Sequence, residues 1–309
     1  MTQDVKTSQL CRSCGTALEK IYEDQQYHPL CCPEHLKLTG TPMSPFEMLL
    51  KEDLLEVMHW INEDNPRSKQ VTLGCSEAGD ECTRKIAYRM TGAKKVNRPD
   101  PLKANMGTAF HHWLDEGMQG FQGARGVSEW KTETEVWPAK FLKGHVDLYN
   151  MSKFLVLDWK TTSADILKEW AKAGLIPAKY LIQVMLYGKG MINAGYRVDR
   201  VGIIGINRSG TFNDILVLTA EYDEAVVQAA LRRVWALGKH LQAVDIENNP
   251  HLFADIPAAP SRLCGWCPNF RGGNKPADAT GCPGEIVPVG DFDSLFKKSS
   301  KSNKSKESK

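Results

Sequence analysis

Apolar positions along this chain of 309 residues follow a helical period first, then a strand period, and the two periods alternate again toward the C-terminus. Apolar residues three and four apart predict a helix, whereas strict alternation or a short apolar run predicts a strand. Helices are expected over 46–62, 83–90, 105–121, 164–173, 177–194 and 225–244, and strands over 128–136, 143–149, 154–159, 200–206 and 212–219. This order predicts an α/β fold with a mixed central sheet flanked by helices.

Three parts of the chain differ in composition. Residues 1–40 hold few apolar residues that could form a core but four cysteines, which predicts a small metal-binding module. A proline-containing linker follows at 41–45 and leads into the main domain, which is expected over 41–290. The remaining segment, 291–309, is rich in lysine and serine and apolar-free from Lys297 onward, so we expect it to be disordered.

Overall composition is typical of a soluble globular protein, with 42% hydrophobic and 25% charged residues. A net charge of +2 neither favours nor excludes nucleic acid, because a local basic groove can lie within a balanced total. No apolar run is long enough to span a bilayer, and the N-terminus has no apolar stretch typical of a signal peptide. We therefore expect a cytoplasmic protein whose nine cysteines bind metal ions and do not form disulfides.

Acidic and basic side chains meet at the ends of two predicted strands. Asp158 and Lys160 lie two apart on an apolar strand and so face the same way, and Asp147 ends the neighbouring strand. Two carboxylates and the carbonyl of Trp159 would form the oxygen site that Mg²⁺ or Mn²⁺ prefers. Such a cation beside a lysine is suited to phosphodiester hydrolysis. The alternative is a surface hairpin with ordinary charges, because an Asp-x-Lys pair alone is common.

Two predicted helices place polar residues four apart, on one face each. On the first, Gly107 leaves room for close approach and His111 could complete a metal shell. On the second, Gln183 and Tyr187 form a similar pair. Either pair by itself is more often structural than functional.

Taken together, these residues resemble the RecB-like branch of the PD-(D/E)XK nucleases, which have a restriction-endonuclease-like core. That family shows a G-x-x-x-H helix, a G-x-x-D strand, a D-x-K strand and a Q-x-x-x-Y helix in this order. The resemblance spans roughly residues 70–285. The four motifs here read Gly107 to His111, Gly144 to Asp147, Asp158 to Lys160, and Gln183 to Tyr187.

The resemblance implies a role for each matched residue. The cation ligands would be His111, Asp147, Asp158 and the carbonyl of Trp159. Lys160 would be the catalytic lysine. Help in positioning DNA or the active site would come from Gln183 and Tyr187.

Four cysteines around this core look similar to the iron–sulfur staple of some RecB-like nucleases, such as AddB and the CRISPR-adaptation nucleases. The first would be Cys82, in the context C-x-R-x-x-x-Y, and the others Cys264, Cys267 and Cys282. The resemblance implies a [4Fe–4S] cluster that ties the two ends of the domain together. The spacing between Cys267 and Cys282 is longer than the family pattern. A zinc site with the same ligands, or Cys75 in place of one of them, is the alternative.

The N-terminal cysteines predict a zinc site. A C-x-x-C pair, Cys11 and Cys14, is followed by a C-x-x-H pair, Cys32 and His35. Cys31 and His28 offer an alternative to the second pair, so the ligand set stays open. The zinc would fold a module too small to hold itself together.

The function expected from these observations is a DNA exonuclease acting in recombination, repair or end processing. No P-loop motif is present, which favours a free-standing nuclease similar to phage-encoded exonucleases. Its partner would be DNA, as duplex ends or single strands, and a recombination or single-strand-annealing protein is a second candidate partner. The alternatives are a sequence- or structure-specific endonuclease on the same core and an inactive, metal-stapled DNA-binding protein.

Overall fold

The computed structural model describes residues 45–64, 73–259 and 262–284. The chain divides into two compact units, Met1–Lys69 and Gln70–Lys309. The described part of the first unit is helix α2 (Pro45–Asp64), which confirms the helix predicted there. The predicted zinc module with Cys11, Cys14, Cys32 and His35 lies outside the described residues, as does the C-terminal tail.

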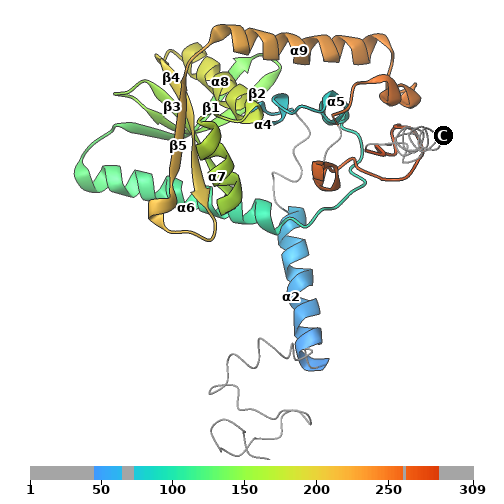
Figure 1. The fold of residues 1–309 in the computed structure, drawn as a ribbon, viewed down its shortest axis with the longest axis horizontal. Coiled ribbons are helices and arrows are strands. Elements are labelled where there is room, and N and C mark those ends of the chain that lie inside the picture. Colours follow the sequence, from blue (N-terminus) through green and yellow to red (C-terminus); the bar gives the residue numbers. More distant parts are fainter. Residues whose placement is uncertain (1–44, 65–72, 260–261, 285–309) are drawn as a thin grey trace, which may run out of the picture. The chain divides into compact units, whose positions relative to one another are not determined.

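A five-stranded mixed sheet forms the centre of the second unit (Figure 1). Its strands lie side by side in chain order and are antiparallel except for β3 and β4, which run parallel and are joined through two helices. The strands are β1 (Trp130–Ala139), β2 (Leu142–Asn150), β3 (Leu155–Thr162), β4 (Arg200–Asn207) and β5 (Leu216–Glu221). The expected mixed sheet is therefore confirmed.

Helices cover both faces of the sheet, and the hydrophobic core on one face is much larger than that on the other. The large core lies between the sheet and the helices α8 and α9, with α4 and α5 beside them. A small cluster of Leu148, Leu157 and Ile204 packs on the other face, against Met118 of the long helix α6. The helix bounds are α4 (Cys75–Ala78), α5 (Thr83–Met90), α6 (Leu102–Arg125), α7 (Ala164–Ala173), α8 (Ala178–Asn193) and α9 (Glu224–Ala243).

Most elements of the second unit lie where the apolar pattern predicts them, but two differ. The strand expected over 212–219 begins only at Leu216. Phe212–Asp214 forms a 3-10 turn instead, in which the side chain of Asp214 accepts a hydrogen bond from Thr211 N. The short helix α4 was not predicted, since four residues are too few to show a period. Two further 3-10 turns, Pro250–Asp255 and Arg262–Trp266, carry the chain back toward α5. Within the described ranges, none of the helices has the length and apolar content needed to cross a membrane.

Candidate active site and cysteine cavity

The sheet opens between β2 and β3 at the predicted carboxylates. These strands pair from Asn150 opposite Leu155 to Leu148 opposite Leu157, and the pairing stops there. The next opposed positions are Asp147 and Asp158. Across the opening, the backbone N–H of Trp159 donates to Asp147 Oδ2 at 2.8 Å. We call this opening, with Asp147, Asp158, Trp159 and Lys160, the carboxylate notch.

Helix α8 holds the second carboxylate in place. Gln183 Nε2 donates to Asp158 Oδ1 at 2.9 Å and lies 2.9 Å from the hydroxyl of Tyr187. Both side chains are buried, with Gln183 bonded to the carboxylate directly and Tyr187 bonded to Gln183 behind it. Gly144 makes room for the ring of Tyr187, because a Cβ there would lie 2.7 Å from Tyr187 Cε1. This contact gives a physical reason for the glycine of the G-x-x-D strand.

Lys160 lies beside Asp158, as the spacing of two predicts. Its Nζ forms an ion pair with Asp158 Oδ2 and lies 4.9 Å from the ring centre of Tyr180 on α8. Apart from this ion pair, Asp158 Oδ2 has no hydrogen-bond partner among the described residues. A buried carboxylate oxygen whose neighbour is a cation, and which has no neutral donor, is suited to bind a metal ion.

His111 reaches the notch from α6, on the other side. Its Nε2 lies 3.1 Å from the carbonyl oxygen of Trp159, and its Nδ1 lies 3.4 Å from Asp147 Oδ2. Helix and strand can approach closely here because Gly107 has only a hydrogen where a Cβ would lie 3.3 Å from Thr161 Oγ1. The predicted group His111, Asp147, Asp158 and Lys160 is therefore brought together in one place.

Charges in the notch change one another's proton affinity. Burial, assisted by Asp147, raises the pKa of Asp158 in spite of the neighbouring Lys160. Burial also opposes ionisation of Asp147, but His111 and Lys160 outweigh it and lower the pKa of Asp147. Burial likewise opposes the charge on Lys160 and His111, yet the two carboxylates raise the pKa of both. The notch thus gathers negative charge that cations neutralise.

Glu133 on β1 is a residue of this site that the sequence did not reveal. One ligand atom each of His111, Glu133 and Asp147 lie within 4.8 Å of one another, and this is the one such group of three or more among the described residues. Glu133 belongs to no recognised motif. Only the pairing of β1 with β2 brings it to Asp147, so the sole available signal was the register of the predicted hairpin.

Aromatic rings stand on the exposed side of α6, next to the His111 position. Phe110 and Trp113 have ring centres 5.4 Å apart, and Phe212 of the β4–β5 loop stacks on Trp113 at 6.4 Å. Trp113 is 52% exposed and Phe212 is 78% exposed. We call these three residues the aromatic platform.

The four predicted cluster cysteines line one cavity. Cys82, Cys264, Cys267 and Cys282 all face a space of about 410 Å³ between α5, α8 and the C-terminal segment. Burial raises the pKa of Cys267. No three of these sulfurs lie within 4.8 Å of one another in the described part of the chain. Around one tetrahedral zinc ion with bonds of ~2.3 Å, sulfurs would lie ~3.8 Å apart.

Cys75 does not belong to this cavity. It is buried in the main core, donates to the carbonyl of Lys143 at 3.4 Å, and lies against the position of Gly144. Burial raises its pKa to about 12. The alternative in which Cys75 replaces a cluster ligand is therefore wrong, and Cys75 is a small buried residue of the core.

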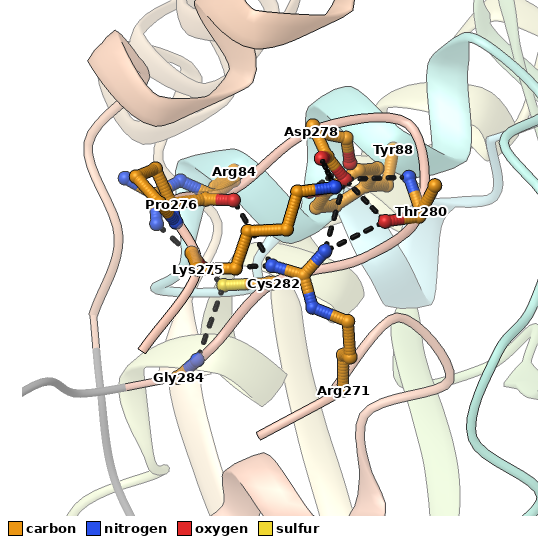
Figure 2. Close-up of polar contacts among 9 residues, drawn as sticks. All are labelled: Arg84, Tyr88, Arg271, Lys275, Pro276, Asp278, Thr280, Cys282 and Gly284. Carbon is orange, nitrogen blue, oxygen red and sulfur yellow. Dashed lines mark hydrogen bonds and ion pairs between the residues drawn. The ribbon is translucent and has the colours of Figure 1, made fainter. Parts of the chain in front are cut away.

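The long spacing between Cys267 and Cys282 is a closed loop (Figure 2). Arg271 ties the loop together by donating to the side chains of Asp278 and Thr280 and to the carbonyls of Lys275 and Pro276, at 2.6–3.0 Å. At the base of the loop, Cys282 N donates to the carbonyl of Asn269 at 2.7 Å. The extra residues therefore return Cys282 to the neighbourhood of Cys267 and do not displace it.

Helix α5 supplies donors that hold this loop. Arg84 donates to the carbonyls of Ile256 and Ala254 and approaches Cys282 Sγ at 3.5 Å. The hydroxyl of Tyr88 donates to the carbonyl of Asp278 at 2.8 Å (Figure 2). These contacts give Arg84 and Tyr88 of the C-x-R-x-x-x-Y pattern a structural role on each side of the loop.

A partly buried acid, Asp80, connects the cysteine cavity to helix α8 beside the notch. Asp80 accepts from Cys82 N at 3.1 Å and forms ion pairs with Lys85 and with Lys179 of α8. Next to Lys179, Tyr180 lines the cavity and also lies against Lys160 of the notch. The first turn of α8 is thus shared by both sites.

No protein-family model and no curated protein matches this sequence. Solved structures that resemble the chain include an alkaline exonuclease from Laribacter hongkongensis, at 13% identity, with 59% of this chain and 93% of that chain covered and a TM-score of 0.43. A phage-related exonuclease from Haemophilus somnus 129PT is 18% identical, with 46% and 73% covered and a TM-score of 0.32. The protein SSO0001 is 18% identical, with 63% and 87% covered and a TM-score of 0.35. Similarity this low gives no residue-by-residue correspondence.

Proposed function

We propose that this chain is a deoxyribonuclease of the PD-(D/E)XK type that depends on a divalent cation and degrades DNA from its ends. The observation that carries the proposal is the convergence of Asp147, Asp158 and Lys160 in the carboxylate notch. Two buried carboxylates in one opening are unfavourable in a protein that has no use for a cation. Phosphodiester hydrolysis is a reaction that needs a cation at such a place.

The ligands proposed for the cation, Mg²⁺ or Mn²⁺, are Asp147, Asp158 and the carbonyl of Trp159. When bound, it supplies the charge that polarises a phosphate and eases deprotonation of water. The residues present fit this role, because among the described residues Asp158 Oδ2 meets only the ammonium of Lys160, and the Trp159 carbonyl keeps a lone pair beyond the one facing His111. Gln183 orients Asp158, and Tyr187 packs behind it.

Lys160 is proposed as the group that stabilises negative charge on the reacting phosphate. Its ammonium is held by Asp158, and both carboxylates raise its pKa, so it stays protonated at neutral pH. A fixed cation in a buried site stabilises a developing charge more strongly than water does. Its position over Tyr180 restricts where it can point.

The aromatic platform favours action at DNA ends. Exposed rings that stack on one another bind nucleobases by stacking, which requires bases that are not enclosed in a duplex. The platform begins at Phe110, next to His111 of the site, so an unpaired base would lie about one helix diameter, ~10 Å, from the cation ligands. Frayed ends supply such bases, and the closed duplex that an endonuclease meets does not.

For the cysteine cavity we propose a [4Fe–4S] cluster held by Cys82, Cys264, Cys267 and Cys282. Support comes from the shared cavity, which four cysteines line, the number that such a cluster needs. Donors near Cys282 Sγ come from Arg84 and Gly284. Protein purified without oxygen should be brown and contain iron; colourless protein with zinc would replace this proposal. The N-terminal zinc module remains a prediction.

End-labelled linear DNA and covalently closed circular DNA, each with Mg²⁺, test the proposed function. We expect the linear form alone to be degraded. Cutting of both forms would favour the endonuclease, and cutting of neither would favour the DNA-binding protein. A second comparison uses Trp113→Ala, which should weaken stacking on a fluorescent unpaired base, beside Trp235→Ala on α9, which is similarly exposed but lies away from the notch. Equal binding by both variants would remove the platform from the proposal.

A further inference from the structure

The β1–β2 hairpin continues past the notch and leaves part of one sheet face uncovered. There Glu135 lies opposite His145, and Val136 lies opposite Gly144. Val136 packs in the main core, so Glu135 and His145 point to the other face, as neighbours along a strand do. Helix α6 contacts β1 near the start of the strand. Farther along, Glu135, Trp137 and His145 are exposed, so this part of the face is open to a ligand.

Aromatic rings and lysines alternate on this part of the hairpin. Trp137 is 48% exposed, and Lys143 Nζ lies 5.6 Å from its ring centre. Phe141 and Lys140, in the turn between the strands, are exposed beside it. Exposed rings interleaved with basic side chains are typical of surfaces that bind unpaired nucleic acid strands. We call Trp137, Lys140, Phe141 and Lys143 the hairpin surface.

Helix α8 holds the backbone under this surface. Asn193, the last residue of the helix, donates to the carbonyls of Trp137 and Pro138 at 2.9 Å and 3.2 Å. Close packing of helix and strand depends on Gly190, because a Cβ there would lie 2.6 Å from Val136 Cβ. A ring carried by a backbone that is already fixed loses little conformational entropy when it binds a ligand.

The hairpin surface lies on one side of the notch, and Phe212 of the aromatic platform lies on the other. The order of the strands gives this arrangement, since the notch opens between β2 and β3 and Phe212 follows β4. At ~3.3 Å per residue, Lys143 lies ~13 Å along β2 from Asp147. At ~3.4 Å per stacked nucleotide, about four nucleotides span this distance, and fewer when the strand is stretched. One DNA strand that crosses the notch can therefore reach both surfaces.

We propose that the hairpin surface binds the unpaired strand of the DNA substrate, on the side of the notch away from Phe212. A base would stack on Trp137, and Lys140 and Lys143 would contact phosphates. This inference rests on the proposed function and narrows its substrate. The strand should be unpaired over about four nucleotides beside the phosphate at the notch.

Glu135 is the one acidic side chain described in direct contact with the hairpin surface, and it limits the affinity for phosphate. Its carboxylate pairs with Lys143 at 2.7 Å and accepts from Trp137 Nε1 at 3.2 Å. It therefore fixes the edge of the indole but neutralises one of the two lysines. Glutamine at this position keeps an acceptor for the indole and removes the negative charge.

Fluorescence anisotropy of a labelled single strand of about 12 nucleotides, with the full chain and without divalent cations, tests the proposal. Trp137→Ala should raise the Kd about tenfold, because one base–ring stack is lost. Trp137→Phe keeps a ring and should retain most of the affinity. The matched control is Trp235→Ala on α9, since Trp235 is 57% exposed and Lys239 Nζ lies 5.6 Å from its ring centre. This control should bind like the wild type.

A charge variant and a duplex complete the test. Glu135→Gln should bind the single strand about threefold more tightly at low salt, and the gain should vanish at high salt. Closed circular duplex should be bound equally by the wild type and Trp137→Ala, because its bases are enclosed. Equal Kd values of Trp137→Ala and Trp235→Ala for the single strand, weaker binding by Glu135→Gln, or an equal loss of duplex binding would each overturn the proposal. Binding that depends on Trp137 in a chain that cleaves no DNA with Mg²⁺ would refute the proposed function and leave the hairpin surface standing.

Discussion

The carboxylate notch and the cysteine cavity are built in opposite ways. The notch is formed by neighbouring strands of one sheet and by two helices packed on its opposite faces. Its residues follow one another within 111–187. The cavity joins residues from far apart in the chain, Cys82 at the start of α5 and the segment from Cys264 to Cys282. Regular backbone pairing positions the first site, whereas turns and side-chain contacts position the second.

This difference predicts a different dependence on bound metal. The strands of the notch are stabilised by the main core, so the site should keep its shape without a cation. Segment 262–284 has few buried apolar residues of its own, and its described side-chain contacts come from Arg271 within it and from Asn97 and Tyr88 outside it. Ligation by the cysteines should therefore supply part of its folding free energy.

The largest expected effect comes from removing the lysine of the notch. Lys160→Ala should lower the rate of DNA cleavage about 10²–10³-fold, because a fixed positive charge near the phosphate is lost. Its melting temperature should fall little, since Asp158 then takes up a proton more readily. Lys153→Ala is the control, because Lys153 lies on the surface turn before β3 and is 62% exposed. Equal rates for the two variants would remove Lys160 from the mechanism.

A smaller and local effect is expected at the cysteine cavity. Cys82→Ala should remove one ligand and expose 262–284, so proteolysis there should accelerate about tenfold or more while the sheet stays folded. Cys75→Ala is the control, since it removes a thiol from the core and not from the cavity. Mass spectrometry of the first fragments distinguishes the two. Identical fragmentation would contradict a stabilising role of ligation.

The sequence predicted the parts of the notch that follow from regular periods. A spacing of two placed Asp158 and Lys160 on one side of a strand, and spacings of four placed His111 over Gly107 and Tyr187 over Gln183. These relations depend only on strand and helix geometry. Their convergence in space was expected from the resemblance and from the order of the elements.

What the sequence could not give depends on exact register and on closed loops. Glu133 meets Asp147 only through the pairing of β1 with β2 and a positive φ, and neither has a signature in residue types. The distance between Cys267 and Cys282 along the chain is a poor guide to their distance in space, because Arg271 closes the loop by contacts that no period predicts. Stacking of Phe212 on Trp113 likewise needs the turn that replaced the expected strand.

The pH dependence of stability should depend on the charges of the notch. In the metal-free notch, Asp158 and His111 have a raised pKa, so the folded chain binds their protons more tightly than the unfolded chain does. That stabilisation is complete at low pH and is lost as the pH rises through the folded pKa values. The melting temperature of metal-free protein should therefore fall by a few degrees between about pH 5 and about pH 8.

Added Mn²⁺ should reverse this fall at the upper end of the range, because the cation replaces the protons. Asp158→Asn should flatten the profile without added metal. An opposite slope in the wild type would mean that the lowered pKa of Asp147, whose contribution is lost as the pH falls, dominates instead.

The smallest expected effect tests whether the loop contacts position Cys282 independently of the metal. Arg271→Ala removes four hydrogen bonds within the loop and should destabilise it by about 1–2 kcal/mol. Arg197→Ala breaks an exposed pair with Asp199, which water and salt screen, and should leave stability almost unchanged. Hydrogen exchange of the amides in 269–282, with and without metal, measures both. If the loop is closed by Arg271, exchange should accelerate in Arg271→Ala even with metal bound; if ligation alone closes it, bound metal should abolish the difference from Arg197→Ala.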